Sequence, residues 1–242
     1  MEQARQIAQG VLAELQNSIP QTSRNTPGRN GRESPKCPIC NDVLWIPLGN
    51  GVARCECQKR RIVEGRIRVV LEDWPEYKSA DLSRYKPVSI SQQNAFRTIA
   101  GNPKGSYFLS GKYSRGKTHL MIAQYRHLAL GGETCILRSA RDLMEELRKA
   151  EMPADSNREV FESPVLQMVN FSAAGHLFVD DFEKAPARSG FREEAVFDLL
   201  DTIKRRQLGL TVTSNLSLAE MSGKIGEAAA ARLFAICREI QL

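Results

Sequence analysis

The sequence predicts an α/β sandwich in which helices cover a parallel sheet, preceded by a small N-terminal helix and a cysteine-rich module. Two observations lead to this prediction. From residue 106 onward, short apolar segments alternate with longer segments of helical periodicity, and such alternation is typical of parallel strands joined by crossover helices. Upstream, residues 37–57 hold four cysteines in two close pairs.

The second part of the chain carries most of the predicted elements. Strands are predicted at residues 106–110, 134–138, 176–179 and 210–213. Helices are predicted at residues 118–130, 140–150, 192–207 and 225–240, with a further helical segment at 92–99. We therefore expect an N-terminal module over residues 1–72 and an α/β domain over residues 73–242.

The N-terminal module begins with a predicted amphipathic helix at residues 2–16, whose apolar residues recur at helical spacing. Such a helix either packs on its own domain or docks in the groove of a partner. Residues 17–36 are rich in Ser, Asn, Pro, Gly and Arg, a composition typical of a linker.

Composition argues against a membrane-spanning or secreted protein. No apolar run in the 242 residues approaches the roughly 18 that a membrane span requires. The first fifteen residues are too polar and too acidic for a secretory signal. We expect a cytoplasmic protein, in which thiols stay reduced.

Positive charge gathers in one segment of a chain whose net charge is +6. Residues 54–68 contain six basic side chains against two acidic ones. A basic stripe of this kind is expected where a protein binds a phosphate backbone. A solvated helix face would have the same composition, so both interpretations stay open.

Residues 111–118, GKYSRGKT, match the phosphate-binding pattern G-x-x-x-x-G-K-[ST] through Gly111, Gly116, Lys117 and Thr118. The match lies between a predicted strand and a predicted helix, where backbone N–H groups and the helix N-terminus attract anions. We expect Lys117 to contact the β- and γ-phosphates and Thr118 to supply a hydroxyl ligand to Mg²⁺.

Acidic and amide side chains follow two later strands. Residues 177–183, LFVDDFE, place Asp180 as the carboxylate on the Mg²⁺ side and Asp181 as the base that orients the attacking water, with Glu183 as an alternative base. Residues 211–215, TVTSN, end on Asn215, whose amide could hold the lytic water or the γ-phosphate by hydrogen bonding.

The cysteine pairs predict a structural zinc site. CPIC and CEC are separated by fourteen residues and supply the four ligands Cys37, Cys40, Cys55 and Cys57. We expect the second pair on an extended strand, where residues two apart face the same side. A cytoplasmic location disfavours disulfides. Cys135 and Cys237, in a predicted strand and helix, are expected to be core thiols.

Five segments within residues 37–238 together resemble the DnaC/DnaI-type helicase loaders, a clade of AAA+ ATPases close to DnaA and IstB. These segments are the CPIC…CEC module, GKYSRGKTHL, LFVDDFE, TSNLSLAEM and IGEAAAARLF. The resemblance implies an AAA+ P-loop αβα sandwich. It also implies that Asn215 is the sensor 1 residue and that Arg232 reaches the nucleotide of a neighbouring subunit. We add Ser114, Arg115 and His119, from the same loop and helix start, to the expected nucleotide-binding residues.

The resemblance further implies a function, an ATP-dependent replicative helicase loader. The implied partners are a DnaB-like hexameric helicase, single-stranded DNA and further copies of the chain, with no membrane, and the implied cofactors are ATP, Mg²⁺ and Zn²⁺. The N-terminal module would grip the helicase, so the helix at 2–16 would dock on a partner. The basic segment at 54–68 would serve the helicase or the DNA.

Several residues depart from the loader pattern. Ser114 and Arg115 stand where glycines are usual, and Gly226-Glu227-Ala228 lacks the arginine of the GER-like motif. A sensor 2 arginine would lie beyond Leu242, and Arg238 is poorly spaced to replace it. Hydrolysis is therefore expected to be weak, or dependent on assembly or DNA.

Two other functions remain compatible with the ATPase motifs. One is an IstB-like transposition helper that assembles on duplex DNA with ATP, although IstB-type proteins generally lack the cysteine module. The other is a zinc-dependent adaptor that binds nucleotide without hydrolysing it.

Overall fold

The computed structural model describes residues 36–151, 163–172, 174–184 and 190–242. By its contacts the chain forms two units, one ending at Val43 and the other running from Leu44 to Leu242. The predicted helix at 2–16, and all but the last residue of the predicted linker at 17–36, lie outside the described residues. Within the described ranges, no helix is both long and apolar enough to cross a membrane.

The described part of the first unit is a tight turn. The backbone N–H of Asn41 donates to the carbonyl of Cys37, and that of Val43 donates to Cys40, both at 2.9 Å. The Asp42 carboxylate accepts from the backbone N–H groups of Lys36 and Cys37 at 3.0 and 3.1 Å. These bonds close the CPIC segment into a loop.

The second unit starts with an antiparallel hairpin of β1 (Trp45–Leu48) and β2 (Gly51–Arg54), followed by helix α2 (Glu56–Val70). The expectation that CEC lies on an extended strand was wrong. Cys55 is the N-cap of α2, and Cys57 lies in its first turn. The chain turns into the helix at Cys55, because the hairpin pairing ends at Arg54.

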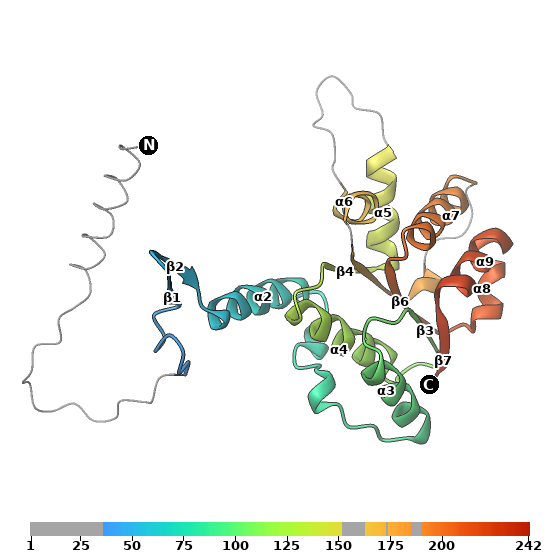
Figure 1. Cartoon of the computed structure of the whole chain (residues 1–242). Coiled ribbons are helices and arrows are strands. Elements are labelled where there is room, and N and C mark those ends of the chain that lie inside the picture. The colour runs from blue at the N-terminus through green and yellow to red at the C-terminus, as the bar shows by residue number, and fades with distance from the viewer. Residues whose placement is uncertain (1–35, 152–162, 173, 185–189) are drawn as a thin grey trace, which may run out of the picture. The chain divides into compact units, whose positions relative to one another are not determined.

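The main sheet has five strands in the order β4-β5-β6-β3-β7, and every neighbouring pair is parallel (Figure 1). The strands are β3 (Tyr107–Ser110), β4 (Cys135–Ser139), β5 (His176–Asp180), β6 (Gly209–Ser214) and β7 (Arg238–Gln241). The first four confirm the predicted strands to within a residue or so.

Helices cover both faces of this sheet. They are α3 (Ile90–Gly101), α4 (Lys117–Leu130), α5 (Ala140–Glu151), α6 (Pro164–Phe171), α7 (Gly190–Arg205), α8 (Leu218–Ile225) and α9 (Glu227–Ile236). Short 3-10 turns lie at η1 (Pro75–Tyr77), η2 (Leu82–Arg84) and η3 (Phe182–Lys184). Helices α3, α4, α5 and α7 confirm predicted helices, whereas α6 and α8 were not predicted.

Alternating strand residues separate the core into two layers. Phe108 of β3 packs with the layer that contains residues of α5 to α9, whereas its neighbours Tyr107 and Leu109 pack with residues of α3 and α4. Leu177 and Phe178 of β5 divide in the same way. This division follows from the two-residue period of a strand that is covered on both faces. The predicted three-layer sandwich is confirmed.

The predicted helix at 225–240 was wrong in two places. Gly226, with φ of 82° and ψ of 155°, ends α8 and precedes α9, and this positive-φ conformation interrupts a helix. Residues 238–241 form strand β7, which pairs with the free edge of β3. Pairing with this edge outweighs the local helical pattern.

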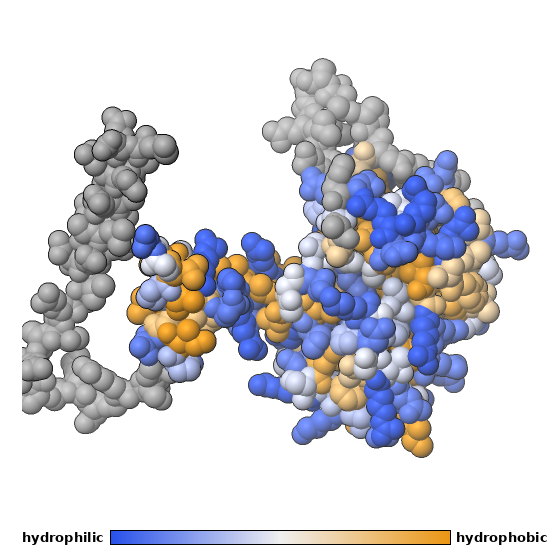
Figure 2. All heavy atoms as spheres, in the orientation of Figure 1, coloured by the Kyte–Doolittle hydropathy of each residue, from blue (hydrophilic) through white to orange (hydrophobic). Residues whose placement is uncertain are grey.

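The six basic side chains of segment 54–68 are all exposed, along β2 and α2. Figure 2 shows hydrophilic side chains over this helix. Two of the charges pair within the helix, Lys59 with Glu56 and Arg60 with Glu64. The buried side of α2 is limited to its end, where Ile67 and the following Leu71 join the core layer of α3 and α4.

Candidate functional site

The site lies at the carboxyl ends of three neighbouring strands. Strand β6 lies between β3 and β5. The GKYSRGKT loop follows β3, Asp180 ends β5, and Asn215 follows β6. Ligands of open parallel sheets bind outside these ends, so the topology brings together three motifs that are far apart in the sequence.

The loop between β3 and α4 has a backbone that requires glycine at two positions. Gly111 has φ of 139°, and a Cβ atom there would lie 2.3 Å from the carbonyl oxygen of Leu242. Gly116 has φ of 84° and caps α4. Ser114 also adopts a positive φ, 58°, a conformation that costs a non-glycine residue about 1–2 kcal/mol. The loop thus holds a non-glycine residue, Ser114, in the left-handed region.

Lys117 is buried and points into the loop. Its Nζ donates three hydrogen bonds of 2.9 Å each, to the carbonyls of Gly111 and Lys112 and to Oδ1 of Asn215. Burial lowers the pKa of Lys117, while the nearby carboxylates of Glu183, Asp181 and Asp180 act in the opposite direction. The ammonium therefore already occupies a pocket lined with oxygen atoms at the centre of the site.

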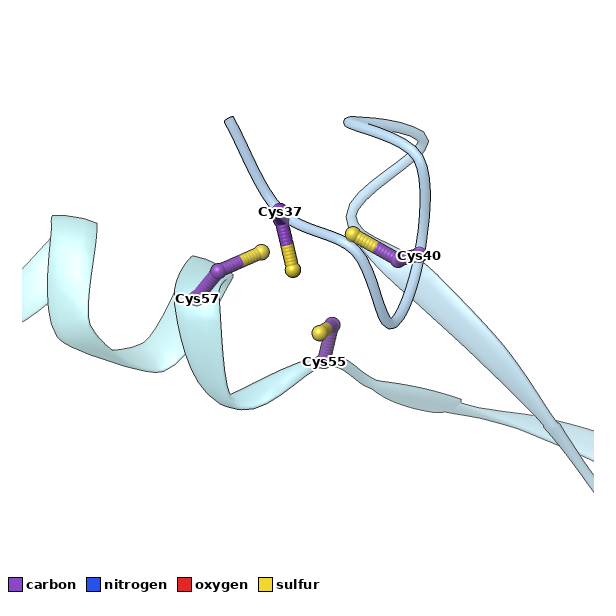
Figure 3. A group of neighbouring side chains, drawn as sticks. All are labelled: Cys37, Cys40, Cys55 and Cys57. Atoms are coloured by element: carbon purple, nitrogen blue, oxygen red, sulfur yellow. The ribbon is translucent and has the colours of Figure 1, made fainter. Parts of the chain in front are cut away.

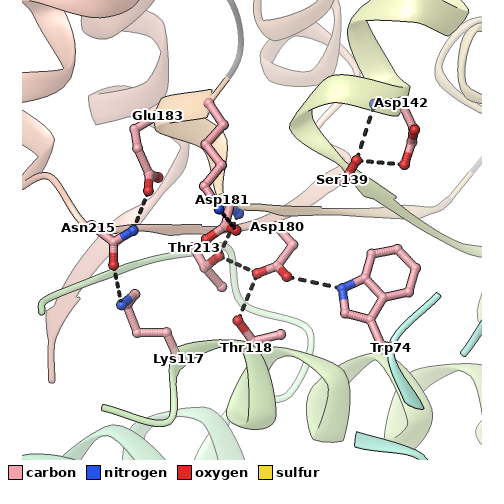
Figure 4. A network of polar contacts seen from close by, with 11 residues as sticks. Trp74, Lys117, Thr118, Ser139, Asp142, Asp180, Asp181, Glu183, Thr213 and Asn215 are labelled. Atoms are coloured by element: carbon pink, nitrogen blue, oxygen red, sulfur yellow. Dashed lines mark hydrogen bonds and ion pairs between the residues drawn. The ribbon is translucent and has the colours of Figure 1, made fainter. Parts of the chain in front are cut away.

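Asp180 is buried, and three donors hold its carboxylate (Figure 4). Oδ1 accepts from the hydroxyls of Thr118 at 2.9 Å and Thr213 at 2.6 Å. Oδ2 accepts from the indole N–H of Trp74 at 3.0 Å. The P-loop threonine and the acidic strand end are thus in direct contact.

The other two acids differ in their surroundings. Asp181 accepts from the ammonium of Lys184 at 2.6 Å, and its backbone N–H donates to the hydroxyl of Thr213 at 2.9 Å. Glu183 accepts from the amide of Asn215 through Oε1. Its second oxygen, Oε2, is buried and has no hydrogen-bond partner among the described residues. Asp181 is thus held by a neighbouring cation, whereas one oxygen of Glu183 has no donor within the described part of the chain.

The oxygen atoms at this site suit a magnesium ion. Mg²⁺ in nucleotide sites is bound by one or two carboxylates or hydroxyls together with phosphate oxygens and water. Thr118 and Asp180 provide a hydroxyl and a carboxylate side by side, and a lysine ammonium lies on the loop beside them. The residues present therefore fit a magnesium–nucleotide complex.

His119 belongs to an aromatic cluster next to the loop. Its ring makes edge contacts with Tyr85 and Tyr77, at centroid distances of 5.3 and 6.0 Å, and Tyr85 stacks on Phe96. Burial lowers the pKa of His119, so the ring is neutral at physiological pH. His119 thus lies behind the loop, in an apolar cluster.

The neighbouring loop residues are exposed. Ser114 and Arg115 both lie on the surface of the loop. The backbone carbonyl of Arg115 accepts from the side chain of Gln92 at 3.1 Å, which links the loop to α3.

Arg232 is not in contact with this site. Its Nε donates to Oδ1 of Asp201 at 2.8 Å, and its guanidinium lies 5.2 Å from the ring centre of Phe197. The hydrogen bond from Arg232 lowers the pKa of Asp201. Its side chain is 35% exposed, so α7 holds the guanidinium at a partly open surface.

The four predicted zinc ligands come together (Figure 3). The sulfur atoms of Cys37, Cys40, Cys55 and Cys57 all lie within 4.8 Å of one another. In a tetrahedral site with Zn–S bonds of about 2.3 Å, sulfurs are about 3.8 Å apart. The cluster is therefore close to the geometry of a structural Cys₄ zinc site.

Two polar contacts of the site were missed by the sequence analysis. Thr213 bridges Asp180 and the backbone of Asp181, and its position inside the TVTSN strand was the only available signal. Trp74 lies between α2 and η1, and nothing in the local sequence relates it to Asp180.

Comparison with known proteins identifies the fold. No protein-family model and no curated protein matches the sequence. Among solved structures, the DnaC helicase loader is similar with a TM-score of 0.57 and 21% identity, over 69% of this chain and 98% of that one. DnaI is similar with a TM-score of 0.55 and 19% identity, over 69% of this chain and 93% of that one.

A third similar structure is AMPPCP-bound DnaA from Aquifex aeolicus, with a TM-score of 0.54 and 18% identity. The match covers 67% of this chain and 50% of the DnaA chain. Together these similarities show that the five-stranded sheet and its helices have the fold of these DnaC, DnaI and DnaA structures.

Proposed function

We propose that this chain is an ATP-dependent loader that delivers a hexameric replicative helicase onto single-stranded DNA. The observation that supports ATP binding most strongly is the contact of Lys117 with Asn215 and of Thr118 with Asp180 at the ends of three adjacent strands. The similar folds of DnaC and DnaI support the loading role.

In this proposal the loop and Lys117 bind the phosphates, and Thr118 and Asp180 hold Mg²⁺, which supplies charge neutralisation at the β- and γ-phosphates when bound. Lys117 exchanges carbonyl oxygens for phosphate oxygens with little movement, because it already lies inside the loop. The loop backbone and the start of α4 provide the donors that orient the phosphates.

Two carboxylates are candidates for orienting the attacking water. Asp181 occupies the sequence position expected for the base, but its carboxylate pairs with Lys184. Glu183 contacts Asn215 and has a buried oxygen with no partner among the described residues. A buried acceptor without a donor is unfavourable by about 1–3 kcal/mol, and a water molecule there would satisfy it. We therefore favour Glu183, with Asp181 as the second candidate.

Arg232 is proposed to act in trans, on the nucleotide of a neighbouring copy. It is partly exposed, and Asp201 and Phe197 of α7 hold it in place. An arginine supplied by a neighbour can raise turnover by orders of magnitude, so hydrolysis would depend on assembly. Mixing Arg232→Ala with Lys117→Ala chains tests this, because only a mixed assembly pairs an intact site with an intact arginine.

We further propose that residues 1–72, with zinc on the four cysteines, form the helicase-binding module, and that the exposed basic side chains of 54–68 contact DNA or the helicase. A patch that binds phosphates loses affinity as salt concentration rises. Reversing charge at Arg66 and Arg68 should therefore weaken binding to single-stranded DNA at low salt if DNA is the partner.

The experiment that tests the loading function combines the protein with candidate replicative helicases and single-stranded DNA, with and without ATP. A stable complex with one helicase, whose recovery changes with nucleotide, is the expected result. Absence of a complex in every nucleotide state would refute the loader function. ATP-dependent filaments on duplex DNA, seen by electron microscopy, would instead favour the transposition helper.

A further inference from the structure

Trp74 connects the turn after α2 to the acidic end of β5. The residue lies between α2 and η1, where its backbone N–H donates to Leu71 at 3.2 Å and its carbonyl accepts from Tyr77 at 3.0 Å. Its indole Nε1 donates to Oδ2 of Asp180 at 3.0 Å, across 106 positions of sequence. The side chain is half-buried, so the contact is shielded from bulk water on one side.

The two oxygens of Asp180 have different partners. Oδ1 accepts two hydroxyl hydrogens, from Thr118 and Thr213, whereas Oδ2 accepts from the indole N–H of Trp74. An indole N–H is a donor only. Its direction therefore sets the rotation of the carboxylate about its last bond. Oδ2 keeps a lone pair for a further partner.

We infer that Trp74 is a positioning residue for Asp180, which orients this carboxylate for Mg²⁺ and ties the turn after α2 to the nucleotide site. The inference rests on the proposed magnesium–nucleotide function of Asp180. Hydrogen bonds from such supporting residues typically change metal affinity by about 10- to 100-fold. Trp74 does not contact the phosphates in this role and acts through Asp180.

The end of α2 packs in the same core layer as α4, the helix that begins at the nucleotide site. Ile67 and Leu71, at and after the end of α2, are each 1% exposed and pack in the core layer that contains α4. Helix α4 begins with Lys117 and Thr118. A shift of the end of α2 would therefore move Trp74 relative to Asp180, and an ordered magnesium site would in turn hold the end of α2 in place.

The chain provides its own reporter, because it has two tryptophans. Trp45 lies in β1 of the hairpin, 43% exposed. In Trp45→Phe protein all indole emission comes from Trp74, whose N–H is bonded to the carboxylate. Adding Mg²⁺ to this protein with bound ATP should change the intensity or wavelength of the emission, and EDTA should reverse the change.

The matched variant is Trp74→Phe, which keeps an aromatic ring and removes the N–H. Binding of a fluorescent ATP analogue is titrated with Mg²⁺, with urea unfolding as a check on folding. We expect the half-saturating Mg²⁺ concentration to rise by about 10-fold, with binding in EDTA unchanged. Trp45→Phe should leave the Mg²⁺ dependence as in the wild type.

Three results would overturn the inference. One is an unchanged Mg²⁺ requirement in Trp74→Phe, and another is a lower one, which would mean that the indole competes with the metal. The third is Trp74 emission that does not change when Mg²⁺ is added, while the analogue binds with normal Mg²⁺ dependence. If the wild type binds no nucleotide at all, the proposed function itself fails, and that result is distinct from these three.

Discussion

The ammonium of Lys117 donates a 2.9 Å hydrogen bond to Oδ1 of Asn215, which joins the phosphate-binding loop to the end of the central strand β6. A lysine can only donate, so the amide oxygen must face Lys117 and the amide N–H₂ must face Glu183. Asn215 is therefore oriented by a cation on one side and an acid on the other.

Replacing Asn215 by Ala should impair turnover more than nucleotide binding. Lys117 would keep its bonds to the carbonyls of Gly111 and Lys112, so affinity for ATP should change by less than about 3-fold. Loss of a polar group that acts on the reacting phosphate should lower the turnover rate by roughly 100-fold. Steady-state kinetics with helicase and DNA present, and a binding titration, separate the two effects.

The control for this variant is Asn94→Ala on the exposed side of α3, which should have normal turnover and affinity. An Asn215→Ala protein that loses affinity and turnover in equal proportion would show that the residue only supports binding.

Glu183→Gln and Asp181→Asn distinguish the two candidate bases. Because Glu183 has a buried oxygen without a partner among the described residues and Asp181 pairs with Lys184, the glutamate change should lower turnover by about 100-fold or more. The aspartate change should lower it by less than about 10-fold. Both variants should bind ATP, as measured by equilibrium dialysis.

If the turnover rate falls strongly in Asp181→Asn and stays close to the wild-type value in Glu183→Gln, Asp181 is the base that orients the attacking water. Equal rates in wild type and both variants would favour an adaptor that does not hydrolyse nucleotide.

Metal content tests the cysteine cluster. Four sulfurs within 4.8 Å of one another predict about one zinc per chain in freshly purified protein. Cys40→Ser should abolish this zinc, because three thiolates bind it far less tightly. Cys135→Ser, in β4 and outside the cluster, should keep it. Elemental analysis gives the result, and wild-type protein without zinc would refute the site.

Stability should fall with acid because of His176. Burial lowers the pKa of His176 to about 3, against 6.5 for an unperturbed histidine. Nε2 lies 2.9 Å from the hydroxyl of Thr211. Because this hydroxyl donates its hydrogen to Gln124, Nε2 carries the hydrogen of the neutral ring and donates to Thr211. Between these two pKa values the unfolded chain binds a proton that the folded chain does not, so stability is lost as pH falls.

His176→Gln keeps a donor and does not titrate. The free energy of unfolding, measured with urea between about pH 4 and 6, should fall less steeply in this variant than in the wild type. The expected difference is about 1.4 kcal/mol per pH unit. Parallel slopes in the two proteins would show that His176 is not the group responsible.

Much of the fold follows from local patterns in the sequence. Strands β3 and β5 are short apolar runs, and the loop after β3 has a pattern that depends on a few residue types at fixed spacing. The residues of β7 continue a helical pattern, so the sequence predicts helix there. Their strand conformation is instead determined by pairing with the free edge of β3. Helix α6, eight residues long, is too short for periodicity to reveal.

The contacts of the site likewise divide into those that local sequence predicts and those that depend on distant segments. The residue types at 117, 118, 180 and 215 were apparent because each ends or follows a strand. Thr213 and Trp74 were not, because their roles arise from packing between distant segments. The helical position of Cys57 likewise depends on where the hairpin ends, and spacing alone did not show it.

The most direct test of this account is binding of MgATP to the wild-type protein and to Lys117→Ala, measured by isothermal titration calorimetry. The account predicts saturable binding at one site per chain in the wild type, and loss of affinity by at least about 100-fold in Lys117→Ala, because the alanine removes a buried cation from the phosphate site. Equal affinity in the two proteins, or no binding by the wild type, would contradict it.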